Sequence, residues 1–269
     1  MEIGKEFLST LLQTLFGVLL TLIGYSAKQL YSRFITRNVR HFWKPFSAQK
    51  LTIIITEYPI TGADRLSRIA KVAGTGWLIS KGMALSLAHL LDFCEGNVTK
   101  RKEITICGDR TGKLETSNTI ILGSPANNLY SKSMFEKLSK MYDIPYQIVW
   151  QENGTSIEVR TVAGDKFSPE LQSGFGNDYA LVIKAQYQTV PPKSLIMISG
   201  CYMWGTMAGA EAVTDPEILN EVTRESNHAE NVAFIVKTRI VNDSPIGPEI
   251  DIDNRQFIRA LKPKKSSVK

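Results

Sequence analysis

The sequence of 269 residues predicts an α/β fold: a Rossmann-like, mainly parallel sheet with an added β-hairpin, preceded by one N-terminal transmembrane helix. Three observations lead to this prediction. Short apolar runs rich in β-branched residues alternate with segments of helical spacing from residue 51 onward, which is typical of a sheet with crossover helices. An Asn-Gly pair at positions 153 and 154 separates two further β-rich runs, as in a hairpin. Residues 7–27 carry no charged side chain.

The uncharged stretch Phe7–Ala27 is the expected membrane anchor. As a helix with ~1.5 Å rise per residue it would span ~30 Å, the thickness of a bilayer's hydrocarbon core. The apolar side chains expected to contact lipid are Phe7, Leu11, Leu15, Val18 and Leu22. A signal peptide is not expected, because acidic residues flank Lys5 and no basic segment leads into the apolar stretch. A buried core helix of a soluble protein is the alternative.

Basic residues follow the anchor and predict its orientation. Residues 28–50 contain Lys and Arg but no acidic residue, so the positive-inside rule places the C-terminal part in the cytoplasm, at the inner membrane if the cell is bacterial. We expect an anchor at 1–27, a basic juxtamembrane neck at 28–50, an α/β domain at 51–261 and a basic disordered tail at 262–269. The net charge of +6 comes largely from the neck and the tail. This favours the lipid bilayer over nucleic acid as the partner.

The first half of the domain reads as strands separated by helices. The β-branched run Leu51–Pro59 predicts a buried strand that Pro59 ends. A basic helix is expected over Asp64–Ala73 and an apolar one over Ala84–Phe93. Two further strands are expected at 104–110 and from residue 118, the second leading into a Gly-Ser-Pro loop. Helical spacing of apolar residues then predicts a helix over Tyr130–Tyr142.

The second half begins with the hairpin runs YQIVW and SIEVRTV. Further strands are expected at 177–186, 195–199 and 231–241, with an edge strand at 255–261. Helices are expected over Met207–Val213, which is rich in Ala and Gly, and over Glu217–Arg224, which follows an Asp-Pro start signal. The segment DSPIGPEIDID is expected to be a loop because it combines Pro and Gly.

Three loops that follow strands form the candidate ligand site. In an open α/β sheet, ligands bind beyond the carboxyl ends of the strands. The first of these loops is Glu57-Tyr58, and the other two are 123–128 and 200–206. The residues expected to contact a ligand are Gly123, Ser124, Asn127, Gly200, Tyr202, Trp204, Gly205 and Thr206. The pair Asn177-Asp178 begins a strand, so we expect it at the opposite edge.

The loop at 200–206 has the outline of a phosphate loop without its lysine. Thr206 stands where Lys would contact the β- and γ-phosphates, so an NTPase is not expected. Its glycines can still turn N–H groups towards an anion at a helix N-terminus, and Tyr202 and Trp204 can stack on a base. The alternative is a tight turn whose glycines serve packing. For Ser124 and Asn127 both ligand contact and turn formation stay open, whereas residue 128 is expected to cap a helix.

Signals for catalysis and metal binding are sparse. Glu57 directly follows a buried strand, and a glutamate there can act as nucleophile or base on a glycosidic bond. No partner acid is evident from the spacing, and no Ser-His-Asp order, GxSxG or GxGxxG occurs. An enzyme is therefore the less favoured interpretation. The three histidines and three cysteines show no metal-ligand spacing, so neither a metal nor a cofactor is expected.

The anchor, the basic neck and two strand–glycine loop–helix units, TIILGSPANN and LIMISGCYMWGTMAGA, carry a resemblance. Together they resemble the membrane-anchored Rossmann-like effectors of bacterial defence systems, in which a nucleotide-sensing domain of the CARF or SLOG type is joined to a transmembrane helix. The resemblance covers most of the chain and is one of architecture. It implies that a nucleotide second messenger binds in the loop crevice. It also implies homo-oligomerisation, in which clustered anchors perturb the membrane.

Three hypotheses about function follow. The first is a membrane-tethered sensor of a nucleotide-like anionic ligand, as in an antiviral defence effector. The second is a membrane-tethered enzyme that cleaves a nucleotide or NAD-like glycosidic bond through Glu57, and the third is a membrane scaffold whose domain makes protein contacts only. Oligomerisation is also expected from Gly17 and Gly24, which lie seven residues apart on nearly one helix face and allow close helix approach.

Overall fold

The computed structural model describes residues 37–47, 50–59, 69–71, 77–110, 117–151, 156–242, 244–250 and 256–264. The predicted membrane anchor, residues 28–36 of the neck and residues 265–269 of the tail lie outside these ranges. Within the described ranges, no helix combines the length and the hydrophobicity that a membrane span requires. The anchor at residues 1–27 remains a prediction.

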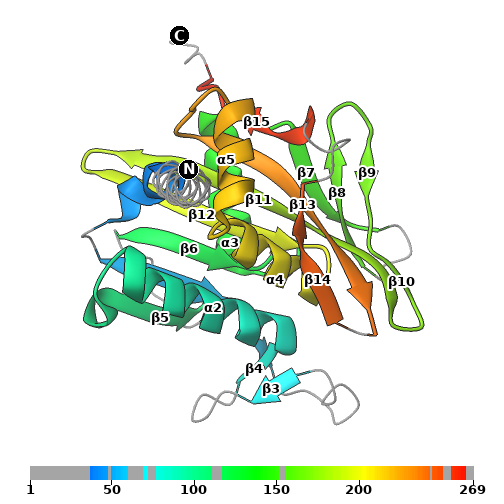
Figure 1. The fold of residues 1–269 in the computed structure, drawn as a ribbon. Helices are drawn as coiled ribbons and strands as arrows, with labels where there is room; N and C mark the ends of the chain where they lie inside the picture. The colour runs from blue at the N-terminus through cyan, green and yellow to red at the C-terminus, as the bar shows by residue number, and fades with distance from the viewer. Residues whose placement is uncertain are drawn as a thin grey trace, which may run out of the picture.

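Within the described part of the chain, a nine-stranded mixed sheet forms the centre of the domain (Figure 1). Its main path has the order β14-β13-β11-β12-β6-β1-β5, with β10 paired to β11 and β15 paired to β13. The strands are β1 Leu51–Ile55, β5 Ile104–Gly108, β6 Asn118–Leu122, β10 Glu170–Gln172, β11 Phe175–Thr189, β12 Pro192–Gly200, β13 Val232–Val241, β14 Ser244–Glu249 and β15 Arg259–Ala260. The predicted α/β class is confirmed.

Four neighbouring strands, β12, β6, β1 and β5, run parallel to one another. β1 and β6 are buried along their whole length, as expected for strands covered on both faces. Ile53 and Ile55 contact the core on one face, and Ile54 contacts the core on the other. Helix α2 (Lys81–Asn97) lies in the connection from β1 to β5, because parallel neighbours need a crossover.

The other half of the sheet is antiparallel. β11 and β12 form a long hairpin, and β13 and β14 extend the sheet by antiparallel pairing. β14 arises within DSPIGPEIDID, where a loop was expected. Its two prolines are compatible with a strand because β14 is at the end of the sheet's main path, and an edge position lets a residue go without a ladder hydrogen bond.

A small antiparallel sheet, β2-β4-β3, lies between β1 and α2 in the chain. Its strands are β2 Tyr58–Pro59, β3 Ile69–Lys71 and β4 Trp77–Ser80. The helix expected over Asp64–Ala73 is wrong for residues 69–71, and the rest of that segment lies outside the described residues. Pairing of β3 with β4 supplies backbone hydrogen bonds that outweigh a weak local helical preference.

Both faces of the central sheet are covered. One face packs against the helical residues 37–43, α2, α4 (Met203–Ala212) and α5 (Pro216–Glu225). The other face packs against α3 (Leu129–Met141) and a sheet of β7 (Tyr146–Trp150), β8 (Ile157–Thr161) and β9 (Lys166–Phe167), seen at the right of Figure 1. Antiparallel pairing of β7 with β8 confirms the predicted hairpin.

The folded domain extends beyond both of the boundaries expected from the sequence. In the neck, Phe42, Trp43 and Phe46 are buried, and Trp43 Nε1 donates a hydrogen bond to Val213 O (2.7 Å). At the other end, Pro263 forms a β-bridge with Tyr142 at the end of α3. The chain therefore enters the domain through a packed aromatic segment.

Candidate ligand-binding edge

The three loops predicted as the ligand site follow adjacent strands. Parallel pairing sets Ile55 of β1 beside Leu122 of β6, and Leu122 beside Ile198 of β12. The loops that begin at Glu57, Gly123 and Gly200 therefore leave the sheet at one edge, which we call the carboxyl edge. The three loops lie at one edge, as expected, because the carboxyl ends of parallel strands share an edge.

Asp178 also lies at the carboxyl edge, which corrects the expected placement of Asn177-Asp178. β11 runs antiparallel to β12, and Ala180 pairs with Gly200. The start of β11 is consequently beside the end of β12. The expectation of an opposite edge assumed a parallel strand, and strand direction is not encoded in the local sequence.

The turn after β6 is held by side chains of the domain itself. Thr56 Oγ1 donates a hydrogen bond to Leu122 O (3.1 Å) and accepts one from Asn128 Nδ2 (3.0 Å). Asn128 Oδ1 accepts from Ser131 N (2.6 Å) and so caps α3, as predicted. Gly123 has a φ of +135°, and a Cβ atom there would overlap Thr56 Oγ1. The glycine serves close packing and an unusual backbone angle.

Ser124 and Asn127 shape the same turn. Ser124 is 1 % exposed, and its Oγ accepts from Ala126 N (3.1 Å). Its carbonyl accepts from the N–H groups of Asn127 (3.0 Å) and Asn128 (2.9 Å). Asn127 is half-buried. These contacts assign turn formation to Ser124, and the half-buried Asn127 belongs to the same turn.

Asp178 occupies the N-terminus of α4, where the sequence predicts an anion. Its carboxylate accepts from the backbone N–H groups of Tyr179 (2.8 Å), Tyr202 (3.1 Å) and Gly205. Burial raises the pKa of the Asp178 carboxyl to about 6, and the hydrogen bonds from these N–H groups counteract part of that rise. The donors that a phosphate would use at this loop are therefore bound to the domain's own carboxylate.

The remaining residues of this loop are mostly packed. A Cβ atom at Gly200 would overlap the backbone nitrogen of Thr206, and one at Gly205 would overlap Tyr179 O. Trp204 is 4 % exposed, so its ring is not available to stack on a base. Tyr202 is half-buried. Among the predicted contacts in this loop, Tyr202 has the most accessible side chain.

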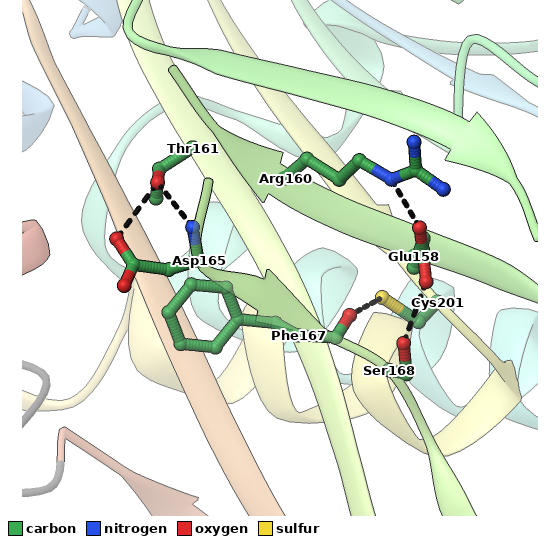
Figure 2. Close-up of polar contacts among 7 residues, drawn as sticks. All are labelled: Glu158, Arg160, Thr161, Asp165, Phe167, Ser168 and Cys201. Carbon is green, nitrogen blue, oxygen red and sulfur yellow. Dashed lines mark hydrogen bonds and ion pairs between the residues drawn. The ribbon is translucent and has the colours of Figure 1, made fainter. Parts of the chain in front are cut away.

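Cys201 anchors the loop to the β8–β9 hairpin (Figure 2). Its Sγ donates to Phe167 O (3.5 Å), and next to it the buried Glu158 accepts from Ser168 Oγ (2.7 Å) and pairs with Arg160. Burial raises the pKa of Glu158, but the hydrogen bonds from Ser168 and Arg160 outweigh it and hold the pKa below its usual value. The contact of Cys201 with Phe167 therefore ties the loop to β9.

A pair of carboxylates lies at the ends of β1 and β5. Glu57 is 6 % exposed, and a Cβ atom at Gly108 would overlap its carboxyl group. The Glu57 backbone N–H donates to Asp109 Oδ1 (2.9 Å), and Asp109 Oδ2 accepts from Leu129 N (3.0 Å). Asp109 was not predicted as a partner acid, because the strand expected at 104–110 included it, whereas β5 ends at Gly108.

The N-terminus of α2 completes the edge. The N-cap Ser80 accepts from Met83 N (3.1 Å). A Cβ atom at Gly82 would overlap Met203 O, so α2 and α4 begin side by side. The exposed Lys81 places its Nζ 5.5 Å from the centre of the Trp204 ring. Lys81 is a second residue that was not singled out from the sequence, and its Nζ lies over a ring of the predicted loop at 200–206.

No group of three or more His, Cys, Asp or Glu side chains in the described ranges is placed to hold a metal ion. No protein-family model matches this chain, and no curated protein or solved structure matches it either. The fold is an α/β domain with a mixed central sheet. At its carboxyl edge the strand-end loops lie together with the carboxylates of Glu57, Asp109 and Asp178 and with Lys81.

Proposed function

We propose that this chain is a membrane-tethered sensor whose α/β domain binds a nucleotide-like ligand at the carboxyl edge. It signals through oligomerisation or membrane perturbation, in the manner of the defence effectors that it resembles. The observation that carries the proposal is the convergence of four parallel strand ends with the N-termini of α2, α3 and α4. Such convergence favours anion binding in α/β proteins.

The chemistry of the edge suits a ligand with both hydroxyl and phosphate groups. Glu57 and Asp109 supply carboxylate oxygens for ribose hydroxyls. Each Asp109 oxygen already accepts one backbone N–H, and its second lone pair is left for a ribose hydroxyl. Lys81 and the start of α2 supply positive charge for a phosphate. Because Asp178 occupies the start of α4, we assign the phosphate to α2. Tyr202 lies between these two regions in the proposal and contacts the base.

The test is a thermal-shift measurement on the purified full chain in mild detergent with a panel of linear and cyclic nucleotides and NAD. A ligand at 100 times its Kd stabilises a protein by about 2.7 kcal/mol, which is a readily measured shift. We expect at least one nucleotide to raise the Tm and Lys81→Ala to reduce that shift. Lys140→Ala, in the last turn of α3, is the matched control. No shift with any compound would refute the proposal.

A second candidate function is cleavage of a nucleotide or NAD-like glycosidic bond. The observation that favours it is the position of Asp109 beside Glu57, which supplies the partner acid that the sequence did not reveal. The Glu57 carboxylate would attack the anomeric carbon as the bond to the base breaks, and water would then release the sugar from the enzyme. Glu57→Gln should abolish base release, measured by chromatography, and keep the wild-type Tm. Equal turnover in Glu57→Gln would exclude this candidate.

A further inference from the structure

The edge of the sheet opposite the candidate site carries positive charge. The edge at which β12, β6, β1 and β5 begin is called the amino edge. Lys50 is exposed directly before β1. Lys100, Arg101 and Lys102 are exposed directly before β5. Because β1 and β5 are neighbouring parallel strands, these four cations lie on one side of the domain.

The end of α3 adds a second basic group to the amino edge. Tyr142, which follows α3, donates from its Oη to Gln186 O (2.8 Å), near the start of β12. Lys140 is exposed in the last turn of this helix. The exposed Lys264 is held beside it, since its backbone N–H donates to Met141 O (2.8 Å). Lysines from distant parts of the sequence therefore meet at this edge.

Acidic residues at the same end of the domain are fewer, and some are already paired. Arg101 lies 3.9 Å from a carboxylate oxygen of Glu95, and Arg224 lies 3.0 Å from one of Glu225. Arg224 also lies 3.6 Å from a carboxylate oxygen of Glu221, and Glu103, Asp143 and Glu230 are further acidic residues in the segments near this end. The lysines around β1, β5 and the end of α3 leave an excess of positive charge.

The chain also enters the domain at the amino edge. The described part of the neck leads through a short 3-10 helix, Lys44–Phe46, into β1. Asn118, the first residue of β6, donates from its Nδ2 to Pro45 O (2.6 Å). The segment at residues 44–46 therefore joins the domain on the side that carries the exposed lysines.

We propose that the amino edge docks on anionic lipid headgroups, so that the carboxyl edge is directed away from the membrane into the cytosol. The inference rests on the membrane tether of the proposed function. Lysines near an anionic bilayer surface are attracted within a Debye length of about 8–10 Å, and each strengthens binding roughly fivefold. Docking leaves the ligand edge open to molecules in the cytosol while the domain stays against the bilayer.

The test uses the full chain reconstituted in nanodiscs of phosphatidylcholine, with or without phosphatidylserine. A fluorophore is placed on Lys262→Cys at the amino edge or on Ala126→Cys at the carboxyl edge, and the lipid headgroups carry a quencher. We expect stronger quenching at residue 262 than at residue 126. We also expect phosphatidylserine to increase the quenching at residue 262 and high salt to reverse it.

Charge reversal gives a matched pair on one helix. Lys140→Glu lies at the amino-edge end of α3, and Lys132→Glu lies in its first turn at the carboxyl edge; both side chains are exposed. Replacing an attracted lysine by a repelled glutamate should lower the docking constant by roughly tenfold or more in Lys140→Glu. Lys132→Glu should leave it unchanged. Equal effects of the two variants would overturn the inference.

The remaining outcomes separate this inference from the proposed function. A chain that does not stay with the nanodiscs has no tether, and both would fall. A tethered chain with equal quenching in both lipids would overturn the docking alone, whether or not nucleotides bind. Binding of duplex RNA that Lys140→Glu abolishes, with no response to phosphatidylserine, would assign the amino edge to nucleic acid and overturn the lipid assignment.

Discussion

The substitution Asp178→Asn tests whether a buried carboxylate organises the carboxyl edge. It keeps the shape of the side chain but removes its charge and one acceptor oxygen. The N–H groups of Tyr179 and Tyr202 can still donate to Oδ1, whereas Gly205 N would face an NH2 group. A buried donor left without an acceptor costs about 1–3 kcal/mol. We expect the variant to be less stable than wild type in acid.

The pH dependence of this difference has a definite sign. Burial raises the pKa of Asp178 to about 6, above its ordinary value. A carboxyl with a raised folded-state pKa contributes stability that is fully present below its unfolded pKa of about 3.9 and is lost as pH rises through about 6. A shift of about two units corresponds to about 3 kcal/mol. The wild-type advantage over Asp178→Asn should therefore shrink by about 3 kcal/mol between about pH 4 and pH 7.

Urea unfolding of both proteins, followed by tryptophan fluorescence between these pH values, measures the difference directly. Glu158→Gln is the contrasting variant, because the pKa of Glu158 is held below its usual value. Its contribution is present above the ordinary glutamate pKa and is lost as pH falls through the lower folded-state pKa, so its pH dependence has the opposite sign. If the Asp178→Asn difference grows with pH, the N–H donors outweigh burial and our reasoning is wrong.

Three further substitutions have expected effects on stability, all measured by urea unfolding. Gly123→Ala should destabilise by about 2–5 kcal/mol, because it adds backbone strain to an overlap with Thr56; an unchanged midpoint would contradict the turn geometry. Ser80→Ala should cost about 1 kcal/mol through loss of the α2 cap, and no loss would show that another group replaces it. Lys184 is 3 % exposed, and burial lowers its pKa to about 8. Lys184→Met removes the cost of burying this charge but also removes the cation–π contact with Phe42, so the net gain in stability at neutral pH should be about 2 kcal/mol. That gain should vanish as pH rises from about 8 to above 10.4, and a destabilised Lys184→Met at neutral pH would contradict the burial cost.

The fold class could be predicted from the local sequence because buried strands contain recognisable runs of apolar, β-branched residues. The runs around Ile53, Ile120 and Ile196 are short, mostly apolar and rich in β-branched residues, which is typical of a strand covered on both faces. Strand direction could not be predicted, because parallel and antiparallel neighbours bury the same residues. β14, with Pro245 and Pro248, was missed since an edge strand tolerates residues that a central strand excludes.

The sequence predicted which edge of the sheet carries the candidate site, but not which side chains contact one another there. The position of a residue after a strand places Glu57 and Gly123 at one edge. The same rule missed Asp109, because the strand was predicted to run to residue 110 and β5 ends at Gly108. The partner of the loop at 200–206 could not be found this way. Asp178 reaches that loop only because β11 runs antiparallel, which depends on pairing between distant segments.

The glycine loops are largely occupied by the domain's own groups, and this changes where a ligand has to be recognised. At the start of α4 the backbone donors are bound to Asp178, and the turn after β6 is filled by Thr56 and its partners. A ligand that used those donors would have to displace a buried carboxylate. Recognition in the proposal therefore depends on side chains, namely Glu57, Asp109 and Lys81, which lie on three separate segments around the two loops. A nucleotide sensor of this kind is sensitive to substitution at these side chains, whereas substitution of the loop glycines acts through folding. Measuring Kd and Tm together for Lys81→Ala and Gly123→Ala separates the two effects: the first should change Kd alone, and the second should change Tm.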